Sequence, residues 1–373
     1  MPRAVVRIDL PNAGINGHLG ELNFSALPFL QYIDLSYNNL LGEIPRSIAS
    51  LGELSHLDLT GNRLHGQIPW EVGNMGSLSV LELSLNNLTG TIPASLGNLT
   101  RLVQLTIHQT LLAGSIPEEL GKLISLEYLQ LSGAFLSGRI PESLGNLTKL
   151  SLLRLYYNQL SGPIPSTLGK LIHLQSVQLS RNQLVGRIAP SFGNLSSLYE
   201  IWMYENKLVG SIPAEIGSLV GLQTLHLATN LISGSIPETL TNLTDLNMFQ
   251  IFSNKLSGSL PLGFSNLTKL AVLDLAKRIN NNDLTGYLPT TFGSLWKLQI
   301  ALDASNNKLT GGIPAQLGNL VMLELLNLSH NKFNGTIPSS VSSMVSLSIL
   351  DVSYNNLEGP LPRGRIFSNA SMG

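Results

Sequence analysis

Apolar residues return along this chain in one spacing, Leu-x-x-Leu-x-Leu-x-x-Asn-x-Leu-x-Gly-x-Ile-Pro, which occurs fifteen times. From Asn38 to Asn254 the period is 24 residues without exception. A unit of this length is too short to enclose its own apolar face, so it must stack on a neighbour of the same shape. We therefore predict that residues 1–373 form one solenoid domain, with about fifteen repeats over residues 8–362 and a short tail over 363–373.

Each repeat predicts one short strand and one turn. In the second repeat Ile33 and Leu35 flank Asp34, the in-out-in alternation of a strand with one buried face. The stretch from Leu96 to Leu99 is too short for an α-helix and indicates a 3-10 turn. We expect an α/β-type solenoid, a right-handed curved horseshoe or superhelix with one long parallel sheet on its concave side and 3-10 turns on its convex side.

Twelve repeats carry an asparagine where the strand ends. A buried amide there can bond backbone groups of neighbouring loops that would otherwise be unpaired. The exceptions are Ala13, Thr110 and Ala134, and the last two are in adjacent repeats, so this asparagine ladder should be weakest there. Most repeats also have an Ile-Pro or Leu-Pro step, and its proline suits an irregular or edge segment on the flank.

The form Leu-x-Gly-x-Ile-Pro resembles the plant-specific leucine-rich repeat, and nearly the whole chain resembles the ectodomains of plant leucine-rich-repeat receptor kinases. Residues 8–15 and 22–30 look most like the first repeats of a grass receptor-like kinase. The resemblance implies a ligand-binding fragment on the extracellular face of the plasma membrane, in the apoplast. It also implies signalling by ligand-dependent recruitment of a co-receptor ectodomain near the C-terminal repeats.

Composition narrows the possible partners. The chain has 22 basic and 23 acidic residues, which gives no electrostatic footprint for nucleic acid or for a membrane surface. It has no cysteine and no apolar stretch of about 18 residues. We expect the cysteine caps, signal peptide and membrane helix of the resembled family to lie outside this chain, which would be a fragment of a longer single-pass protein. A cytosolic protein is the alternative explanation for the missing cysteines.

The sequence offers no catalytic constellation. The seven histidines are spread along the chain and never at metal-ligand spacing. The glycines fall at the repeat period and form no phosphate loop or nucleophile elbow. We expect no metal, no cofactor and no enzyme activity, because an open curved face is a binding surface rather than a pocket that excludes water.

Asn-x-Ser/Thr sequons predict glycosylation in a secreted protein. Five belong to the repeat's own Asn-Leu-Thr/Ser on the convex turn, and only Asn327 falls on a concave strand position. The ten sequons are at Asn23, Asn87, Asn98, Asn146, Asn194, Asn242, Asn266, Asn327, Asn334 and Asn369.

The outward strand positions differ between the ends and the middle of the chain. Near the ends they are mostly small or acidic, whereas the middle carries tyrosine, tryptophan and arginine, the residue types that dominate interface energies. We predict that an extended peptide or protein ligand binds these residues, and the alternative is repeat drift in which aromatic side chains merely shield neighbouring strands. The predicted ligand-binding residues are Gln130, Arg154, Tyr156, Tyr157, Gln178, Arg181, Trp202, Tyr204, Glu205, His226 and Phe252.

Two irregularities interrupt the period. Four extra residues precede Asn282, with the surplus in the segment 277–281, where we favour a tolerated insertion over a basic contact loop. One extra residue precedes Leu302 and indicates a β-bulge.

Two other functions fit the repeat. One is a secreted inhibitor resembling polygalacturonase-inhibiting proteins, which carry the same repeat but usually fewer copies and cysteine caps. The other is a structural or ice-contacting solenoid, which should present a flat and regular array. The irregular middle of this chain counts against the second.

Overall fold

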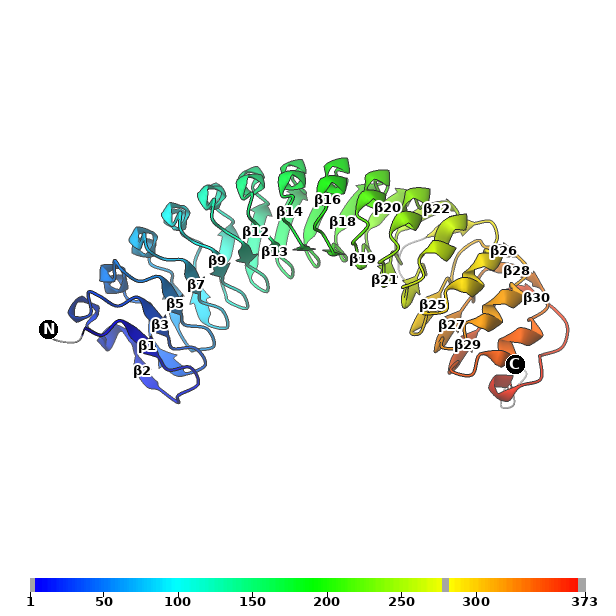
Figure 1. The fold of residues 1–373 in the computed structure, drawn as a ribbon, viewed down its shortest axis with the longest axis horizontal. Coiled ribbons are helices and arrows are strands. Elements are labelled where there is room, and N and C mark those ends of the chain that lie inside the picture. The colour runs from blue at the N-terminus through cyan, green and yellow to red at the C-terminus, as the bar shows by residue number, and fades with distance from the viewer. Residues whose placement is uncertain (1–3, 277–281, 368–373) are drawn as a thin grey trace. The chain divides into compact units, whose positions relative to one another are not determined.

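The structure is a computed structural model that describes residues 4–276 and 282–367. The segment 277–281, which carries the predicted insertion, and the sequon at Asn369 lie outside the described residues. The chain divides into two compact units, Met1–Leu184 and Val185–Gly373, which we describe separately. Within each unit, Figure 1 shows the strands on an inner side and the 3-10 turns on an outer side.

Every repeat contributes one three-residue strand to the inner side, and the strands pair in parallel in sequence order. This confirms the predicted fold class. The first unit contains β1 (Arg7–Asp9), β3 (Tyr32–Asp34), β5 (His56–Asp58), β7 (Val80–Glu82), β9 (Gln104–Thr106), β11 (Tyr128–Gln130), β13 (Leu152–Arg154) and β15 (Ser176–Gln178). The second contains β17 (Glu200–Trp202), β19 (Thr224–His226), β21 (Met248–Gln250), β23 (Val272–Asp274), β25 (Ala301–Asp303), β27 (Leu325–Asn327) and β29 (Ile349–Asp351).

The flank, which we expected to be an irregular or edge segment, contains a second set of parallel strands. They are β2 (Asn16–His18), β4 (Asn39–Leu41), β6 (His65–Gln67), β8 (Asn87–Thr89), β10 (Ala113–Ser115), β12 (Phe135–Arg139), β14 (Gln159–Pro163), β16 (Gln183–Gly186), β18 (Lys207–Gly210), β20 (Leu231–Gly234), β22 (Lys255–Ser259), β24 (Asp283–Thr285), β26 (Thr310–Gly311), β28 (Lys332–Gly335) and β30 (Asn356–Leu357). These strands end before the Ile-Pro or Leu-Pro step, and the pairing also ends where Ala189 replaces its proline, so the missing N–H of proline is not what ends it.

All helical elements in the described part of the chain are 3-10 turns, as predicted. In η5, for example, the N–H of Leu96 donates to the carbonyl of Pro93 at 3.1 Å. The turns are η1 (Leu19–Glu21), η2 (Phe24–Ala26), η3 (Arg46–Ser50), η4 (Trp70–Asn74), η5 (Ala94–Asn98), η6 (Glu118–Lys122), η7 (Glu142–Asn146), η8 (Ser166–Lys170), η9 (Pro190–Asn194), η10 (Ala214–Ser218), η11 (Glu238–Asn242), η12 (Leu262–Asn266), η13 (Thr290–Ser294), η14 (Ala315–Asn319), η15 (Ser339–Ser343) and η16 (Arg365–Phe367).

The repeated apolar residues form the core between the strands and the turns. In the third repeat Leu54, Leu57, Leu59 and Leu64 are all at most 1% exposed. Phenylalanines replace leucine or isoleucine at several core positions of the second unit, where the rings of Phe264 and Phe292 lie 5.7 Å apart. Burial of each such side chain contributes about 1.5–3 kcal/mol to folding.

The asparagine ladder forms as predicted. The amide nitrogen of Asn62 donates to the carbonyls of Leu59 at 3.0 Å and of Leu35, in the preceding repeat, at 2.9 Å. Its oxygen accepts the N–H of Leu40 at 3.0 Å. The ladder continues past the insertion, because the amide oxygen of Asn282 accepts the N–H of Leu256 at 3.1 Å. Each asparagine thus joins its own repeat to the preceding one.

The ladder is interrupted at the two exceptions. Thr110 is buried and its hydroxyl has no hydrogen-bond partner among the described residues, and Ala134 is 9% exposed with no polar side-chain atom. Neither residue can supply the amide that Asn158 supplies in the next repeat, where it accepts the N–H of Leu136 at 3.1 Å. The predicted weak point therefore coincides with a missing set of buried hydrogen bonds.

The single extra residue before Leu302 precedes β25. Val272 in β23 pairs with Ala301 in β25. The N–H groups of Gln299 and Ile300 both donate to the carbonyl of Ala271, at 3.3 and 3.1 Å. A carbonyl shared by two consecutive N–H groups also occurs in regular repeats, as at Gln31, so the β-bulge stays a prediction.

Glycine sets how closely the outer turns approach each other. A Cβ atom on Gly97 in η5 would collide with the backbone oxygen of Glu119 in η6, and the equivalent collision recurs at Gly73, Gly121 and Gly217. Where Ala49, Thr241 or Ser265 replaces the turn glycine, that turn packs less closely on the next one.

Where a larger residue replaces the turn glycine, a small residue on the next turn can restore part of the lost space. Gly263 in η12 faces Thr241, where other repeats have serine, threonine or glutamate. Opposite Ser265 there is no such glycine, and the bond from the Thr291 hydroxyl to the carbonyl of Leu262 is 3.4 Å long. The equivalent bond from Ser143 to Glu118 is 2.7 Å long.

The turn glycine gives a prediction with a matched control. Gly97→Ala should destabilise the protein by about 1–3 kcal/mol, because the new methyl group forces two packed turns apart. Gly76→Ala should be neutral or stabilise by about 0.4–1 kcal/mol, since nothing lies within 4 Å of its Cβ position. Urea denaturation measures the stability of both variants. Equal changes in stability would show that the close approach of the turns does not explain the effect of Gly97→Ala.

The ladder gives a second prediction. Ala134→Asn should stabilise the chain by about 1 kcal/mol by restoring buried hydrogen bonds between adjacent repeats. Ala94→Asn, at an exposed turn position, serves as the control. An unchanged or lowered denaturation midpoint for Ala134→Asn would show that this site has adapted to the smaller side chain.

Candidate functional site

The inner face of the first unit begins with a row of acidic side chains. Asp9, Asp34, Asp58 and Glu82 occupy paired positions on β1, β3, β5 and β7. Burial, together with the negative charges of Asp58 and Asp34, raises the pKa of Glu82. Six of the fifteen repeats carry aspartate at this position, all of them among the first three or the last four repeats, so the row marks the regular end of the first unit.

The predicted site residues of the first unit follow on later strands. Gln130, Arg154 and Gln178 occupy paired positions on β11, β13 and β15. The Nε atom of Arg154 is buried without a hydrogen-bond partner among the described residues. Burial, and then the positive charge of Arg154, lowers the pKa of His108. These side chains form one row with a single positive charge.

Beyond the strand ends the first unit presents an exposed cation–π pair. The ring of Tyr157 is 57% exposed, and the guanidinium carbon of Arg181 lies 5.3 Å from its centroid. Tyr156 is half-buried beside it in the sequence. An exposed pair of this type contributes about 0.5–1 kcal/mol and leaves most of the tyrosine ring accessible to a partner.

In the second unit the predicted aromatic residues form one cluster. Trp202 and His226 occupy paired positions on β17 and β19, with ring centroids 5.3 Å apart. Tyr204 stacks on His226 at 4.3 Å, and Phe252 lies 6.1 Å from His226 on the other side. The indole N–H of Trp202 donates to a carboxylate oxygen of Glu200 at 2.9 Å, which fixes the orientation of its ring. We call Trp202, Tyr204, His226 and Phe252 the aromatic cluster.

His226 lies at the centre of the aromatic cluster and is unusually placed. It is 9% exposed, and neither ring nitrogen has a hydrogen-bond partner among the described residues. Burial lowers its pKa to about 4, so the imidazole is neutral at physiological pH. A buried polar group without partners costs about 1–3 kcal/mol. Sequence analysis placed His226 on the exposed face and missed its burial, because the neighbouring rings that cover it belong to other repeats.

Three predicted site residues share an unusual backbone conformation. Tyr157, Arg181 and Glu205 have φ of 59°, 54° and 52°. The same left-handed conformation recurs at the residue before the ladder position in most repeats, including Tyr37 and Tyr354 near the two ends. It is therefore a property of the repeat, in which the chain turns inward toward the ladder asparagine. The strain marks no special function at the three site residues.

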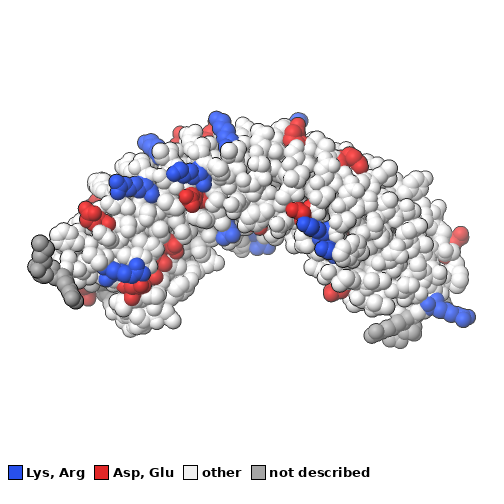
Figure 2. Space-filling view, viewed as in Figure 1, with Lys and Arg blue, Asp and Glu red and all other residues white. Residues whose placement is uncertain are grey.

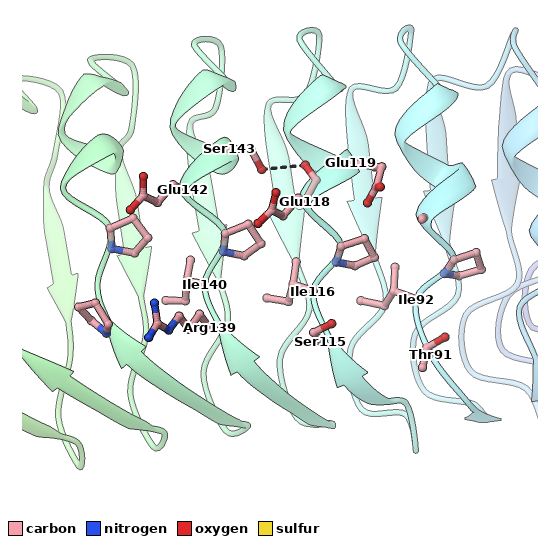
Figure 3. Close-up of a pocket in the computed structure, with 16 residues that line it drawn as sticks. Thr91, Ile92, Ser115, Ile116, Glu118, Glu119, Arg139, Ile140, Glu142 and Ser143 are labelled. Carbon is pink, nitrogen blue, oxygen red and sulfur yellow. Dashed lines mark hydrogen bonds between the residues drawn. The ribbon is translucent and has the colours of Figure 1, made fainter.

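A hollow of about 920 Å³ on the flank of the first unit was not predicted. Figure 3 shows successive Ile-Pro steps along its floor, with Glu118, Glu119 and Glu142 on the side of the 3-10 turns. Seven of its sixteen lining residues belong to the repeat's own Ile-Pro steps, which the sequence pattern indicated to be structural. It is lined by Thr91, Ile92, Pro93, Ala94, Ser115, Ile116, Pro117, Glu118, Glu119, Arg139, Ile140, Pro141, Glu142, Ser143, Pro163 and Pro165.

Charge is dispersed over the surface. Figure 2 shows acidic and basic residues interspersed on the face it presents, with no basic stripe of the kind that binds nucleic acid. Within the described residues no three histidine, aspartate or glutamate side chains gather as a metal site would require. No helix in the same part of the chain is long and apolar enough to span a membrane.

The sequon asparagines are mostly accessible. Five are exposed at the ends of 3-10 turns, namely Asn98, Asn146, Asn194, Asn242 and Asn266. Asn23, Asn87 and Asn334 are also exposed. Asn327 differs, because it is half-buried on β27 and its amide oxygen accepts both the N–H and the O–H of Ser329, at 3.1 and 2.8 Å.

Comparison with protein families identifies the repeat. One leucine-rich-repeat family matches residues 5–64. A second matches seven segments, 77–99, 125–147, 149–171, 173–195, 221–243, 300–320 and 322–344. No relative was found among curated proteins.

Several solved structures are similar to the whole chain. The plant peptide hormone receptor RGFR1, solved with RGF2, is 37% identical with a TM-score of 0.83, and the match covers 92% of this chain and 58% of that one. The TDR receptor is 34% identical with a TM-score of 0.89, over 96% of this chain and 61% of that one. The Arabidopsis receptor kinase HAESA, solved with the peptide hormone IDA and the co-receptor SERK1, is 31% identical with a TM-score of 0.56, over 94% and 70%. The chain thus spans about three-fifths of the first two.

The burial of His226 gives a prediction for stability against pH. An unfolded histidine has a pKa of about 6.5, so as the pH falls below that value the unfolded chain takes up a proton that the folded protein refuses until about pH 4. Stability should therefore fall across this window, by up to about 3 kcal/mol, and this part of the loss should stop below it.

Replacing the imidazole by a ring of similar shape tests this. His226→Phe should remove that part of the acid-induced loss, as measured by urea denaturation from pH 7 to pH 4. His173→Phe, at an exposed position, is the control and should retain the wild-type slope. A His226→Phe variant with the wild-type slope would mean that the imidazole titrates normally in the folded protein.

Proposed function

We propose, because this chain belongs to the leucine-rich-repeat family and is similar along its length to plant receptor kinase ectodomains, that it is the ligand-binding part of a plant receptor-like kinase. The proposal places it on the extracellular face of the plasma membrane, as part of a longer single-pass protein. Its ligand is an extended peptide that binds the inner face. The sequons at the exposed turn ends carry N-linked glycans.

One observation carries the proposal, the aromatic cluster on the inner face of the second unit. Near the ends the equivalent strand positions carry aspartate, as at Asp34 and Asp351, whereas here they carry Trp202 and His226. Tryptophan and tyrosine supply large contact areas with few rotatable bonds, and such residues dominate binding energies. The hydrogen bond from Trp202 to Glu200 holds the indole ready for contact, which lowers the entropy lost on binding.

Charged and polar groups on the inner face of each unit provide specificity in this proposal. In the first unit Arg154 and Arg181 offer guanidinium groups that suit a carboxylate on the ligand. Glutamine side chains at Gln130 and Gln178 can exchange hydrogen bonds with an extended peptide backbone. Glu205 in the second unit suits a cationic ligand side chain. The other proposed contacts are made by Tyr156, Tyr157, Tyr204 and Phe252.

The similar structures support a two-component mode of signalling. HAESA was solved with both a peptide hormone and the co-receptor SERK1. We extend this arrangement to the present chain, in which a co-receptor ectodomain is recruited to the C-terminal repeats after the peptide has bound. Enzyme activity is not part of the proposal for this chain, since the inner face offers a broad contact surface rather than a closed pocket.

The anchor residue gives the test. A panel of secreted plant peptides that includes RGF2 and IDA is titrated against the protein by calorimetry. Trp202→Ala should weaken binding of the best peptide about 30-fold, which corresponds to about 2 kcal/mol. Trp296→Ala, which removes an exposed tryptophan from an outer turn, and Ser348→Ala, on the last repeat, should leave affinity unchanged.

Two results would contradict this assignment. Equal losses for Trp202→Ala and Trp296→Ala would show that the effect is not located at the aromatic cluster. No loss for Trp202→Ala, with binding retained, would show that the cluster only shields neighbouring strands.

A further inference from the structure

The outer turns carry two kinds of residue at one equivalent position. In the first unit this position holds Thr100, Ile124, Thr148 and Ile172 in successive repeats. The backbone there is the same in each repeat, because its N–H donates to the carbonyl two residues earlier at 2.9 to 3.0 Å. The threonine and isoleucine side chains therefore leave neighbouring turns from equivalent points.

The aliphatic members of this row are strongly exposed. Ile124 is 60% exposed and Ile172 is 52% exposed, and in the second unit Val220 is 63% exposed. A single exposed aliphatic residue is ordinary on a protein surface. The turns of Ile124, Ile172 and Val220 each have a sequon on a neighbouring turn, whereas those of Val321 and Val345, which are 44% and 78% exposed at the same position, have none.

The alternation is complete around Ile124 and Val220. Ile124 lies between the turns that end in Asn98 and Asn146, and Val220 lies between those that end in Asn194 and Asn242. On the sequon turns the row position is the serine or threonine of Asn-x-Ser/Thr. On the aliphatic turns lysine or serine takes the place of the asparagine, as at Lys122 and Ser218.

We infer that the core sugars of the glycans on these flanking asparagines lie over the intervening aliphatic side chains, those on Asn98 and Asn146 over Ile124 and those on Asn194 and Asn242 over Val220. This inference rests on the extracellular location in the proposed function, because only a secreted chain is N-glycosylated. The C–H face of a pyranose ring is apolar, so its contact with isoleucine removes apolar surface from water while the hydroxyl groups stay hydrated.

The spacing of the turns supports this arrangement. The turns η5, η6 and η7 pack closely on one another through their glycines, so sugars on all three would compete for the same space. If only every second turn carries a glycan, each glycan has an unglycosylated neighbouring turn that it can cover. The consecutive pair Asn242 and Asn266 fits the same reasoning, because Thr241 and Ser265 replace the turn glycine there and η11 and η12 pack less closely.

A double-mutant cycle tests the contact. The full chain is produced in glycosylating eukaryotic cells, and mass spectrometry of peptides establishes occupancy at Asn98 and Asn146. The pair Thr100→Ala and Thr148→Ala removes both sequons, and Ile124→Thr gives the middle turn the residue of its neighbours. Loss of the glycans should lower the melting temperature by about 2 °C or more when Ile124 is present and by less than half as much with Ile124→Thr.

Two controls isolate the sugar. The same four proteins made in bacteria, without glycans, should show no coupling between the sequon substitutions and Ile124→Thr. Removal of the Asn87 glycan by Asn87→Gln, on a flank strand, should have the same effect with and without Ile124→Thr.

The outcomes separate this inference from the proposed function. Unoccupied Asn98 and Asn146, or equal shifts with and without Ile124→Thr, would overturn the inference even if a peptide binds in a Trp202-dependent manner. Coupling between glycan and Ile124 in a protein that binds no peptide would uphold the inference and count against the proposed function.

Discussion

The fold depends on satisfying backbone groups at the point where each strand turns inward. Strands of three residues leave carbonyls such as that of Leu59 inside the protein, where an unpaired group would cost about 1–3 kcal/mol. One buried asparagine amide bonds two such carbonyls and one N–H, and it draws one of the carbonyls and the N–H from the preceding repeat. Stability is therefore built from contacts between neighbours, as in other one-dimensional arrays. The ladder also continues past the four extra residues before Asn282, since the amide of Asn282 bonds Leu256 and Leu275.

The period of the sequence was enough to predict the inner strands, the 3-10 turns and the ladder with its two weak repeats, because these depend on residues that recur at fixed spacing. The flank strands were missed, since a glycine and a proline near the same segment suggested irregular backbone. We also missed that Gly263 faces Thr241, the residue that replaces the turn glycine. This arrangement depends on which residues of neighbouring repeats face each other, and the spacing within one repeat does not show it. The organisation of residues 1–373 as a single domain stays a prediction.

The candidate site shows where sequence reasoning ends. Alternation along a strand predicts which side chains lie on the face opposite the core, as at Arg154 and Trp202, whereas Tyr157 and Arg181 lie beyond the strand ends. It does not tell which outward side chain is covered by its neighbours, and so the burial of His226 under Trp202, Tyr204 and Phe252 was not foreseen. The mutual packing of these rings is also what shielding alone would produce, which is why the binding measurement with Trp202→Ala is decisive. Ligand chemistry is set by side chains that the repeat leaves free to vary, and no periodic pattern encodes it.

The turn glycine gives the architecture a separate adjustment of shape. On the inner side the distance between repeats is fixed by backbone hydrogen bonds, whereas on the outer side it depends on the residue at one position per turn, as the contrast between Gly97 and Ser265 shows. A wider outer edge with an unchanged inner edge means a smaller radius of bending. A single substitution at an outer turn can therefore alter the local curvature of the inner face without changing any residue on that face. In a leucine-rich-repeat protein, local curvature and surface chemistry can thus change independently of each other.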